Sequence, residues 1–290
     1  MIKKILENKL IQVVIFLIAF LICSYAISLV PGELYDDWRI YRHAAQNILR
    51  GETPYFENTG YFNPPWVAIL LIPFSLVPFR IGAGMLSTTS IIIVILICLK
   101  YKFSKIKVIF IAISPIVFYI IVHSQIDALV LAGIFLPVSW WPLVAISKPQ
   151  IAIGLGAHAL KKSTIMSAII ILTIVLGVSF MIFGFWPSHS MNNSPEILNA
   201  SWNMWRDVWP LFFPIGLAFV LLGIQQNEVD WLLIASPFLF PYTAYSSFLG
   251  IWIILHKKTN NWQTVILWVA SWISYIIWDP RICGICNSIF

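Results

Sequence analysis

Charged residues are scarce in this sequence, which has 18 basic and 12 acidic residues among 290. Hydrophobic residues make up 60% of the chain and its mean hydropathy is +0.87, whereas a soluble domain is about half apolar. The core of a soluble domain cannot bury so much apolar surface. The composition therefore predicts an all-α polytopic membrane protein, because uncharged runs such as 10–30 and 165–186 are long enough to cross a bilayer.

Cysteine is also scarce, with four residues in the chain. Cys23 and Cys98 lie in apolar segments, where a free thiol packs like a small hydrophobic group. Cys283 and Cys286 form a single CxxC without a second pair or a nearby histidine. A disulfide, an idle pair and a metal site all stay open there, with the metal site least favoured, and no site is assigned.

Basic residues give the chain a net charge of +6, but their positions argue against a nucleic-acid partner. Eleven of the twelve lysines lie in four short connectors: Lys3, Lys4 and Lys9; Lys100, Lys102, Lys105 and Lys107; Lys161 and Lys162; Lys257 and Lys258. The positive-inside rule predicts that these connectors are cytoplasmic. All six arginines fall in stretches left on the other side: Arg39, Arg42, Arg50, Arg80, Arg206 and Arg281. Lys148 is the one lysine outside the connectors.

These connectors divide a single predicted membrane domain, residues 1–290, into five parts. Residues 1–30 form an uncleaved first span, because the apolar run is longer than that of a signal peptide. The other parts are an external loop with juxtamembrane helices, a helical core, a second external loop, and C-terminal spans with a tail (31–80, 81–186, 187–208 and 209–290). Their alternation predicts about nine to eleven crossings of the plasma membrane, with a cytoplasmic N-terminus and an external C-terminus.

Several crossings are predicted to be short or broken. Residues 64–79 form a helix that is half-buried in the outer face and starts at its two prolines, because a full span there would place the next lysine connector outside. Residues 141–160 must go out and return, which predicts two short helices with Lys148 at the outer turn between them. The remaining spans are predicted at 82–99, 107–122, 126–139, 165–186, 209–225, 231–256 with a break near Pro241, and 262–279.

Charge gathers between Tyr35 and Glu57, where seven side chains are charged. A helix over 36–49 places an apolar set of side chains on one face: Trp38, Tyr41, Ala45, Ile48 and Leu49. A polar set faces away: Arg39, Arg42, His43, Asn47 and Arg50. Gly51 is a typical residue to end such a helix. The pattern predicts an amphipathic helix that lies flat on the outer membrane surface.

Two aspartates stand at the start of this helix. Asp36 is predicted to be its N-cap, and Asp37 in the first turn would complement the helix dipole. Asp37 is also a candidate general base, because a carboxylate at a membrane surface near cations and aromatic rings can take a proton from a hydroxyl.

The same region opens a series of motifs that resembles a known family. The motifs are Asp37-Trp38-x-x-Tyr41-x-x-Ala44-Ala45, Leu49-x-Gly51-x-x-Pro54-Tyr55, Tyr61-Phe62-Asn63-Pro64-Pro65, Ser124-Gln125-x-Asp127-x-Leu129 and Ala145-x-x-Lys148-Pro149-Gln150. In this order they resemble membrane glycosyltransferases of the GT-C class, with glycosyltransferase family 87, the polyprenyl-phosphate-mannose-dependent mannosyltransferases, as the nearest family. Asn63 stands where that family has Tyr, Ser124 where it has Gly, and Asp127 where it has Asn.

The resemblance implies a GT-C-like helix bundle that transfers a hexose, mannose in the family, from a polyprenyl-phosphate donor. The acceptor would be a lipid or glycan on the external face, and Asp37 would act as the base with inversion. The departing phosphate would be stabilised by cations: Lys148 and one or more of Arg39, Arg42 and Arg80. The sugar or the acceptor would contact Gln125, Asp127, Tyr41, His43 and Tyr55. No metal or other cofactor is expected.

Some of these residues also have structural explanations. Asp127 can cap its helix, an interfacial tyrosine can anchor the chain, and a surface histidine can simply be solvated. Burial of an unpaired lysine among apolar helices costs free energy, so such a lysine tends to be functional. The alternative for Lys148 is that its side chain extends to the outer lipid headgroups, and a functional role is favoured over it.

Two other functions stay open: a lipid or small-solute carrier, and an inactive GT-C-like protein that binds a lipid-linked sugar or a partner. A carrier needs polar groups near the bilayer midplane, whereas the charges other than lysine gather on one predicted face.

Overall fold

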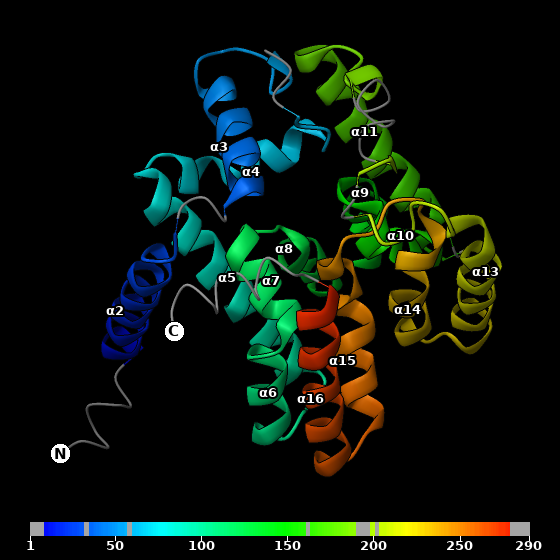
Figure 1. The fold of residues 1–290 in the computed structure, drawn as a ribbon. Helices are drawn as coiled ribbons and strands as arrows, with labels where there is room; N and C mark the ends of the chain where they lie inside the picture. The colour runs from blue at the N-terminus through cyan, green and yellow to red at the C-terminus, as the bar shows by residue number, and fades with distance from the viewer. Residues whose placement is uncertain are drawn as a thin grey trace. The chain divides into compact units, whose positions relative to one another are not determined.

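A computed structural model of the chain describes residues 9–31, 35–56, 60–160, 163–189, 198–200 and 203–278 (Figure 1). These residues form helices and loops without a β-strand, which confirms the all-helical prediction. The α-helices are α2 (Lys9–Ser28), α3 (Asp36–Leu49), α4 (Pro65–Ser75), α5 (Phe79–Lys100), α6 (Lys105–Ala112), α7 (Pro115–His123), α8 (Asp127–Leu131), α9 (Trp141–Ser147), α10 (Pro149–Ala159), α11 (Ile165–Phe183), α13 (Trp209–Gln226), α14 (Val229–Leu239), α15 (Leu249–Lys258) and α16 (Asn261–Trp278). Short 3-10 helices cover Ala132–Phe135, Val138–Trp140 and Tyr245–Phe248. The Cys283 and Cys286 pair and the Lys161 and Lys162 connector lie outside the described residues.

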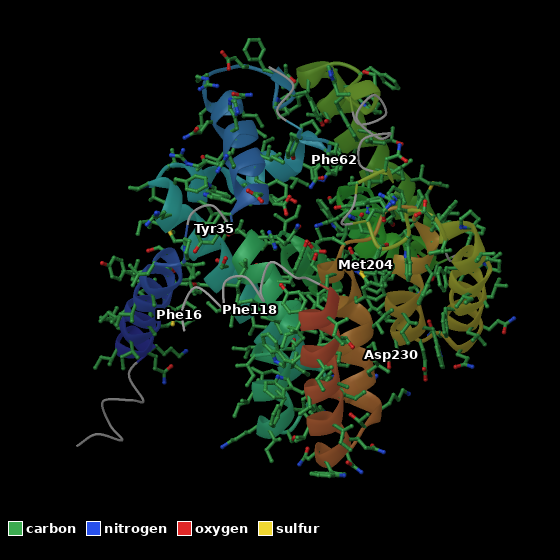
Figure 2. The ribbon with its side chains drawn as sticks, viewed as in Figure 1. Phe16, Tyr35, Phe62, Phe118, Met204 and Asp230 are labelled. Carbon is green, nitrogen blue, oxygen red and sulfur yellow. The ribbon has the colours of Figure 1, made fainter. Side chains whose placement is uncertain are left out.

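Four helices are long and apolar enough to cross a membrane: α2, α5, α11 and α13. The pair α6 and α7, bent by 45°, provides a fifth if it forms one span. Apolar side chains stand exposed along α2, including Phe16 at 54%, as expected for a helix in contact with lipid (Figure 2). These helices indicate a membrane-embedded protein. The number of crossings and their orientation stay predictions.

Other helices are short, as the sequence predicted. α4 has 11 residues and so rises about 16 Å, roughly half the thickness of the hydrocarbon core. α9 and α10 break at Lys148, and α14 and α15 are separated near the predicted break. The predicted span over 126–139 is instead α8, with five residues, followed by 3-10 turns, because Gly133 and Pro137 weaken a continuous helix.

The structure divides into two compact units. Unit 1 falls within Met1–Ser90, Ile120–Ile126 and Val175–Ser194, and unit 2 within Ile91–Tyr119, Asp127–Ile174 and Pro195–Phe290. Helices α5, α7 and α11 each have one part in unit 1 and one in unit 2. The division follows packing rather than chain order, and the single membrane domain with five consecutive parts stays a prediction.

Unit 1 attaches α3 to the N-terminal helices. α3 packs on α4, and the fully buried Trp38 donates a hydrogen bond from its indole nitrogen to the carbonyl of Phe79 over 2.9 Å. α2 and α5 approach closely, because a Cβ at Gly84 would lie 2.1 Å from the carbonyl oxygen of Ser24. The side chain of Ser24 also donates to Thr88 over 3.2 Å. α3 is therefore fixed to the first turn of a long apolar helix.

Connectors predicted to share one side of the membrane contact one another in unit 2. On the predicted cytoplasmic side, Lys257 pairs with Asp230 at the start of α14 over 2.5 Å, and Ser104 donates to the first residue of α16 over 2.9 Å. On the predicted external side, the backbone nitrogen of Met204 donates to the carbonyl of Thr243 over 3.0 Å. These contacts agree with the predicted alternation of the connectors, while the orientation itself stays a prediction.

Candidate functional site

Helix α3 has the predicted bounds but a different N-terminus. It begins at Asp36, and its N-cap is Tyr35, which forms no side-chain cap hydrogen bond. The prediction that Asp36 is the N-cap is therefore wrong. Tyr35 is fully buried and its hydroxyl donates to the carbonyl of Ile27 over 2.5 Å, so this anchored side chain sets where the backbone enters the helix. Asp36 and Asp37 both lie in the first turn, where negative charge complements the helix dipole.

Gly51 closes the C-terminus of α3, as predicted, two residues after the last residue of the helix. The φ of Gly51 is 78°, in the left-handed region that glycine favours. The backbone nitrogens of Glu52 and Gly51 donate to the carbonyls of Asn47 and Ile48 over 2.9 Å and 3.0 Å, respectively. This pair of bonds is a Schellman motif, which satisfies the last carbonyls of the helix.

The apolar face of α3 is buried against protein. Trp38, Tyr41 and Ala45 are buried as predicted, so these side chains do not pack on lipid. Leu49 is 49% exposed, as a side chain that meets lipid would be, whereas Asn47, which was assigned to the face pointing away, is fully buried. The end of the helix explains the burial of Asn47, because Arg50 and the Schellman motif use its side-chain and backbone oxygens.

Asp37 is held by a residue that lies 88 positions away in the sequence. Its carboxylate accepts a hydrogen bond from the side-chain amide of Gln125, and both residues belong to unit 1. Gln125 is buried and Asp37 is partly exposed. An amide donor orients a carboxylate without neutralising its charge. An oriented and accessible carboxylate meets the geometric requirement for a general base.

A strained turn presents Gln125 to Asp37. Ser124 has a φ of 49°, which is uncommon for a residue with a side chain. Its backbone nitrogen donates to the carbonyl of Ile121 over 3.2 Å, and its buried hydroxyl lies 3.3 Å from that of Ser87. The motif of the resembling family has glycine at this position, which suits the left-handed backbone. The departure from the motif therefore keeps the turn, with a hydrogen bond to offset part of the strain.

Three motif tyrosines pack together in unit 1. The ring of Tyr61 lies 6.5 Å from that of Tyr41 and 5.6 Å from that of Tyr55. The hydroxyl of Tyr55 donates to the carbonyl of Asn63 over 2.7 Å, and that of Tyr61 to Pro64 over 2.9 Å. Burial raises the pKa of both hydroxyls well above the ordinary value, so they stay protonated donors at neutral pH. Tyr41 and Tyr55 thus shape the loop after α3, and their contact with a sugar or acceptor stays a prediction.

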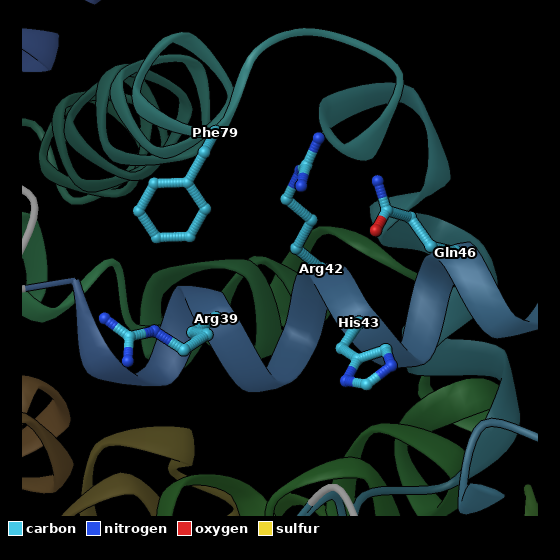
Figure 3. Close-up of a pocket in the computed structure, with 5 residues that line it drawn as sticks. All are labelled: Arg39, Arg42, His43, Gln46 and Phe79. Carbon is cyan, nitrogen blue, oxygen red and sulfur yellow. The ribbon is translucent and has the colours of Figure 1, made fainter. Parts of the chain in front are cut away.

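The polar face of α3 lines a hollow of about 170 Å³ (Figure 3). The lining residues are Arg39, Arg42, His43 and Gln46 of α3 and the ring of Phe79. Asp37 precedes Arg39 by two residues and Arg42 by five, which turns the side chains about 160° and 140° apart around the helix. α3 therefore does not bring these two arginines to the Asp37 carboxylate, although all three were predicted to serve one reaction.

Arg80 has a different environment from the arginines of the hollow. It is exposed on the first turn of α5. Burial raises the pKa of Tyr35 to about 12, and the charge of Arg80 works against that rise. Arg80 therefore lies near the entry to α3, where its role in binding phosphate stays a prediction.

Lys148 belongs to unit 2 and forms an ion pair with Asp127. The exposed fractions of the two side chains are 5% and 0%. Lys148 is the break between α9 and α10, and Asp127 is the first residue of α8. Lys148 was predicted to be unpaired at an outer turn, but it is buried and paired. The cost of an unpaired charge therefore gives no reason to assign it a function.

Sequence reasoning missed two parts of these arrangements. Gln46 and Phe79 complete the hollow, and the spacing of 39, 42, 43 and 46 on one helical stripe was a usable signal for Gln46. His189, which stacks on Tyr55 with ring centroids 5.0 Å apart, had no local signal because the contact is long-range.

Metal ligands do not gather in the described part of the chain, where no three His, Cys, Asp or Glu side chains come together. The absence of a metal requirement stays a prediction. The chain was also compared with known proteins, and no family model, curated protein or solved structure matches it. The family resemblance therefore rests on the motifs themselves.

Proposed function

We propose that this protein is a membrane glycosyltransferase that moves a hexose, with mannose as the first candidate, from a polyprenyl-phosphate donor to a hydroxyl of a lipid or glycan. The observation that supports this proposal is the partly exposed Asp37 carboxylate, oriented by the buried amide of Gln125. The apolar helices offer a setting for a lipid donor. The reaction is proposed for the external face of the plasma membrane, without a metal or other cofactor.

In the proposed reaction, Asp37 accepts the proton of the acceptor hydroxyl while the hydroxyl oxygen forms a bond to the anomeric carbon. The bond between that carbon and the phosphate oxygen breaks, and its electron pair leaves with the lipid phosphate. Attack opposite the leaving group inverts the anomeric configuration. Gln125 acts as a positioning residue, because it holds the carboxylate and does not exchange a proton.

The departing lipid phosphate needs positive charge nearby. Arg39 and Arg42 project from the other side of α3, which leaves Arg80 as the proposed cation of unit 1. Lys148 belongs to unit 2 and is paired with Asp127, so its role in binding phosphate stays a prediction. Arg80 is exposed, so a phosphate can reach it.

Comparison of Asp37→Asn with Asp36→Asn tests the proposal. The two aspartates share the first turn of α3 and differ in their contacts, so the second variant is a matched control. With reconstituted protein and polyprenyl-phosphate-linked sugars, we expect Asp37→Asn to slow transfer by about 10² to 10⁴-fold and Asp36→Asn to change it by less than about threefold. Equal transfer by wild type and Asp37→Asn would remove Asp37 as the base. No transfer by the wild type with any donor would contradict the enzyme itself.

A carrier is the second candidate, and the buried pair of Lys148 and Asp127 favours it. Ionisable groups among apolar helices, next to a broken helix, are typical of transport pathways. Movement of a labelled lipid-linked sugar across protein-containing vesicles would support this function, provided that Asp127→Asn abolishes the movement and Asp37→Asn does not.

A further inference from the structure

The hollow on α3 has the chemistry of an anion site. Two guanidinium groups, an imidazole and an amide line it, and its lining includes no acidic side chain. Arginine binds phosphate with a planar fork of donors, and an amide adds a neutral donor. Figure 3 shows Arg39 and Arg42 leaving α3 in different directions with the Phe79 ring between the helices. Phosphate is the anion that this combination suits best.

Arg42, which lines the hollow, has a side-chain hydrogen-bond donor that is not used. Its Nε atom is buried and has no hydrogen-bond partner among the described residues. One terminal nitrogen donates to the carbonyl of Val77 over a long 3.4 Å. Neither Arg39 nor Arg42 forms an ion pair with an acid in the part of the chain that the structure describes. A buried donor without an acceptor costs its desolvation free energy, so binding of a ligand that supplies an acceptor is favoured.

The hollow lies at the end of an apolar helix. Phe79 is the first residue of α5, which has 22 residues and is long enough to cross a membrane. A hollow beside the first turn of such a helix falls at the level of lipid headgroups if α5 spans the bilayer. Arginines at this depth meet lipid phosphates, whereas Asp37 faces the other side of α3.

We infer that the hollow lined by Arg39, Arg42, His43, Gln46 and Phe79 binds the phosphate of an anionic membrane phospholipid. The bound lipid would hold α3 at the membrane surface through its polar face, while its apolar face packs on α4 and α5. This site is separate from the proposed reaction at Asp37, and it does not depend on glycosyl transfer.

Binding of phosphatidylglycerol to the full chain in detergent tests the inference, with bound lipid counted by native mass spectrometry. We expect the wild type to bind phosphatidylglycerol at least about tenfold more tightly than phosphatidylcholine. The double variant Arg39→Gln/Arg42→Gln should lose this preference, and Arg42→Lys should keep part of it because the charge stays and the planar fork does not. Arg206→Gln is the matched control, since Arg206 is exposed and pairs with Asp207.

Several results would overturn the inference. One is equal binding of phosphatidylglycerol by the wild type and the double variant at matched melting temperatures. Another is binding of inorganic phosphate or glycerol phosphate as tight as that of the lipid, which would assign the hollow to a soluble anion. Displacement of phosphatidylglycerol by polyprenyl phosphate at equal concentration would assign it to the donor. Asp37→Asn should bind phosphatidylglycerol like the wild type, so failure of the proposed reaction and failure of this site remain distinguishable.

Discussion

Asp37 in unit 1 and Asp127 in unit 2 are both held by a side chain distant in sequence, but their surroundings differ. Asp37 is partly exposed and accepts from a neutral amide. Asp127 is fully buried and accepts from the ammonium group of Lys148. A neutral partner leaves the charge of a carboxylate in place, whereas a buried ammonium neutralises it. The first arrangement suits a base that exchanges protons with a substrate, and the second suits a fixed contact between helices.

The largest effect on stability is expected where the buried pair is broken. Lys148→Met leaves Asp127 buried without its cation, and the free energy of unfolding should fall by about 3 to 5 kcal/mol. The double variant Lys148→Met/Asp127→Leu should recover most of that loss, because both charges are gone. Unfolding in mixed detergent micelles measures these changes.

Lys257→Met is the matched control for that experiment. Its partner is Asp230, and the lysine side chain is 36% exposed and that of Asp230 8%, so water screens this pair more than the Lys148 pair and the expected loss is smaller. A loss for Lys148→Met no greater than that of the control would contradict the role given to burial.

An intermediate effect is expected at the partner of Asp37. Gln125→Leu removes the amide that orients the carboxylate, and kcat for sugar transfer should fall about tenfold with little change in KM. Gln226→Leu, at an exposed glutamine in unit 2, is the control and should leave transfer unchanged. Unchanged kcat in Gln125→Leu would show that Asp37 does not need this partner.

The smallest effect is expected at the turn before Gln125. Ser124→Gly relieves the left-handed backbone and loses the contact with Ser87, so the two changes should cancel to within about 1 kcal/mol. Ser124→Ala loses the contact without relief and should destabilise the protein by about 1 kcal/mol more than Ser124→Gly. The melting temperatures of the two variants measure this difference in stability. Greater stability of the alanine variant would contradict the role given to backbone strain.

Local features of the sequence predicted much of the secondary structure. The bounds of α3 follow from its amphipathic spacing and from Gly51, and the start of α4 follows from its prolines. The break at Lys148 follows from Pro149, which cannot donate a backbone hydrogen bond. The N-cap of α3 and the burial of Asn47 were missed, because both depend on contacts outside the helix pattern or at its end.

The sequence by itself determined that this chain is a helical protein rich in apolar helices, where the long helices lie, and that Asp37 lies in the first turn of an amphipathic helix. Hydrophobic composition, hydrophobic periodicity and proline act on the conformation of a few neighbouring residues, so these features of secondary structure can be predicted from the sequence alone. Only the tertiary structure decided that Gln125 holds Asp37, that Lys148 is paired with Asp127, and that Phe79 of α5 closes the hollow over the polar face of α3. These relations depend on which helices pack together and on how each is rotated, and the sequence pattern of a single helix does not contain that information.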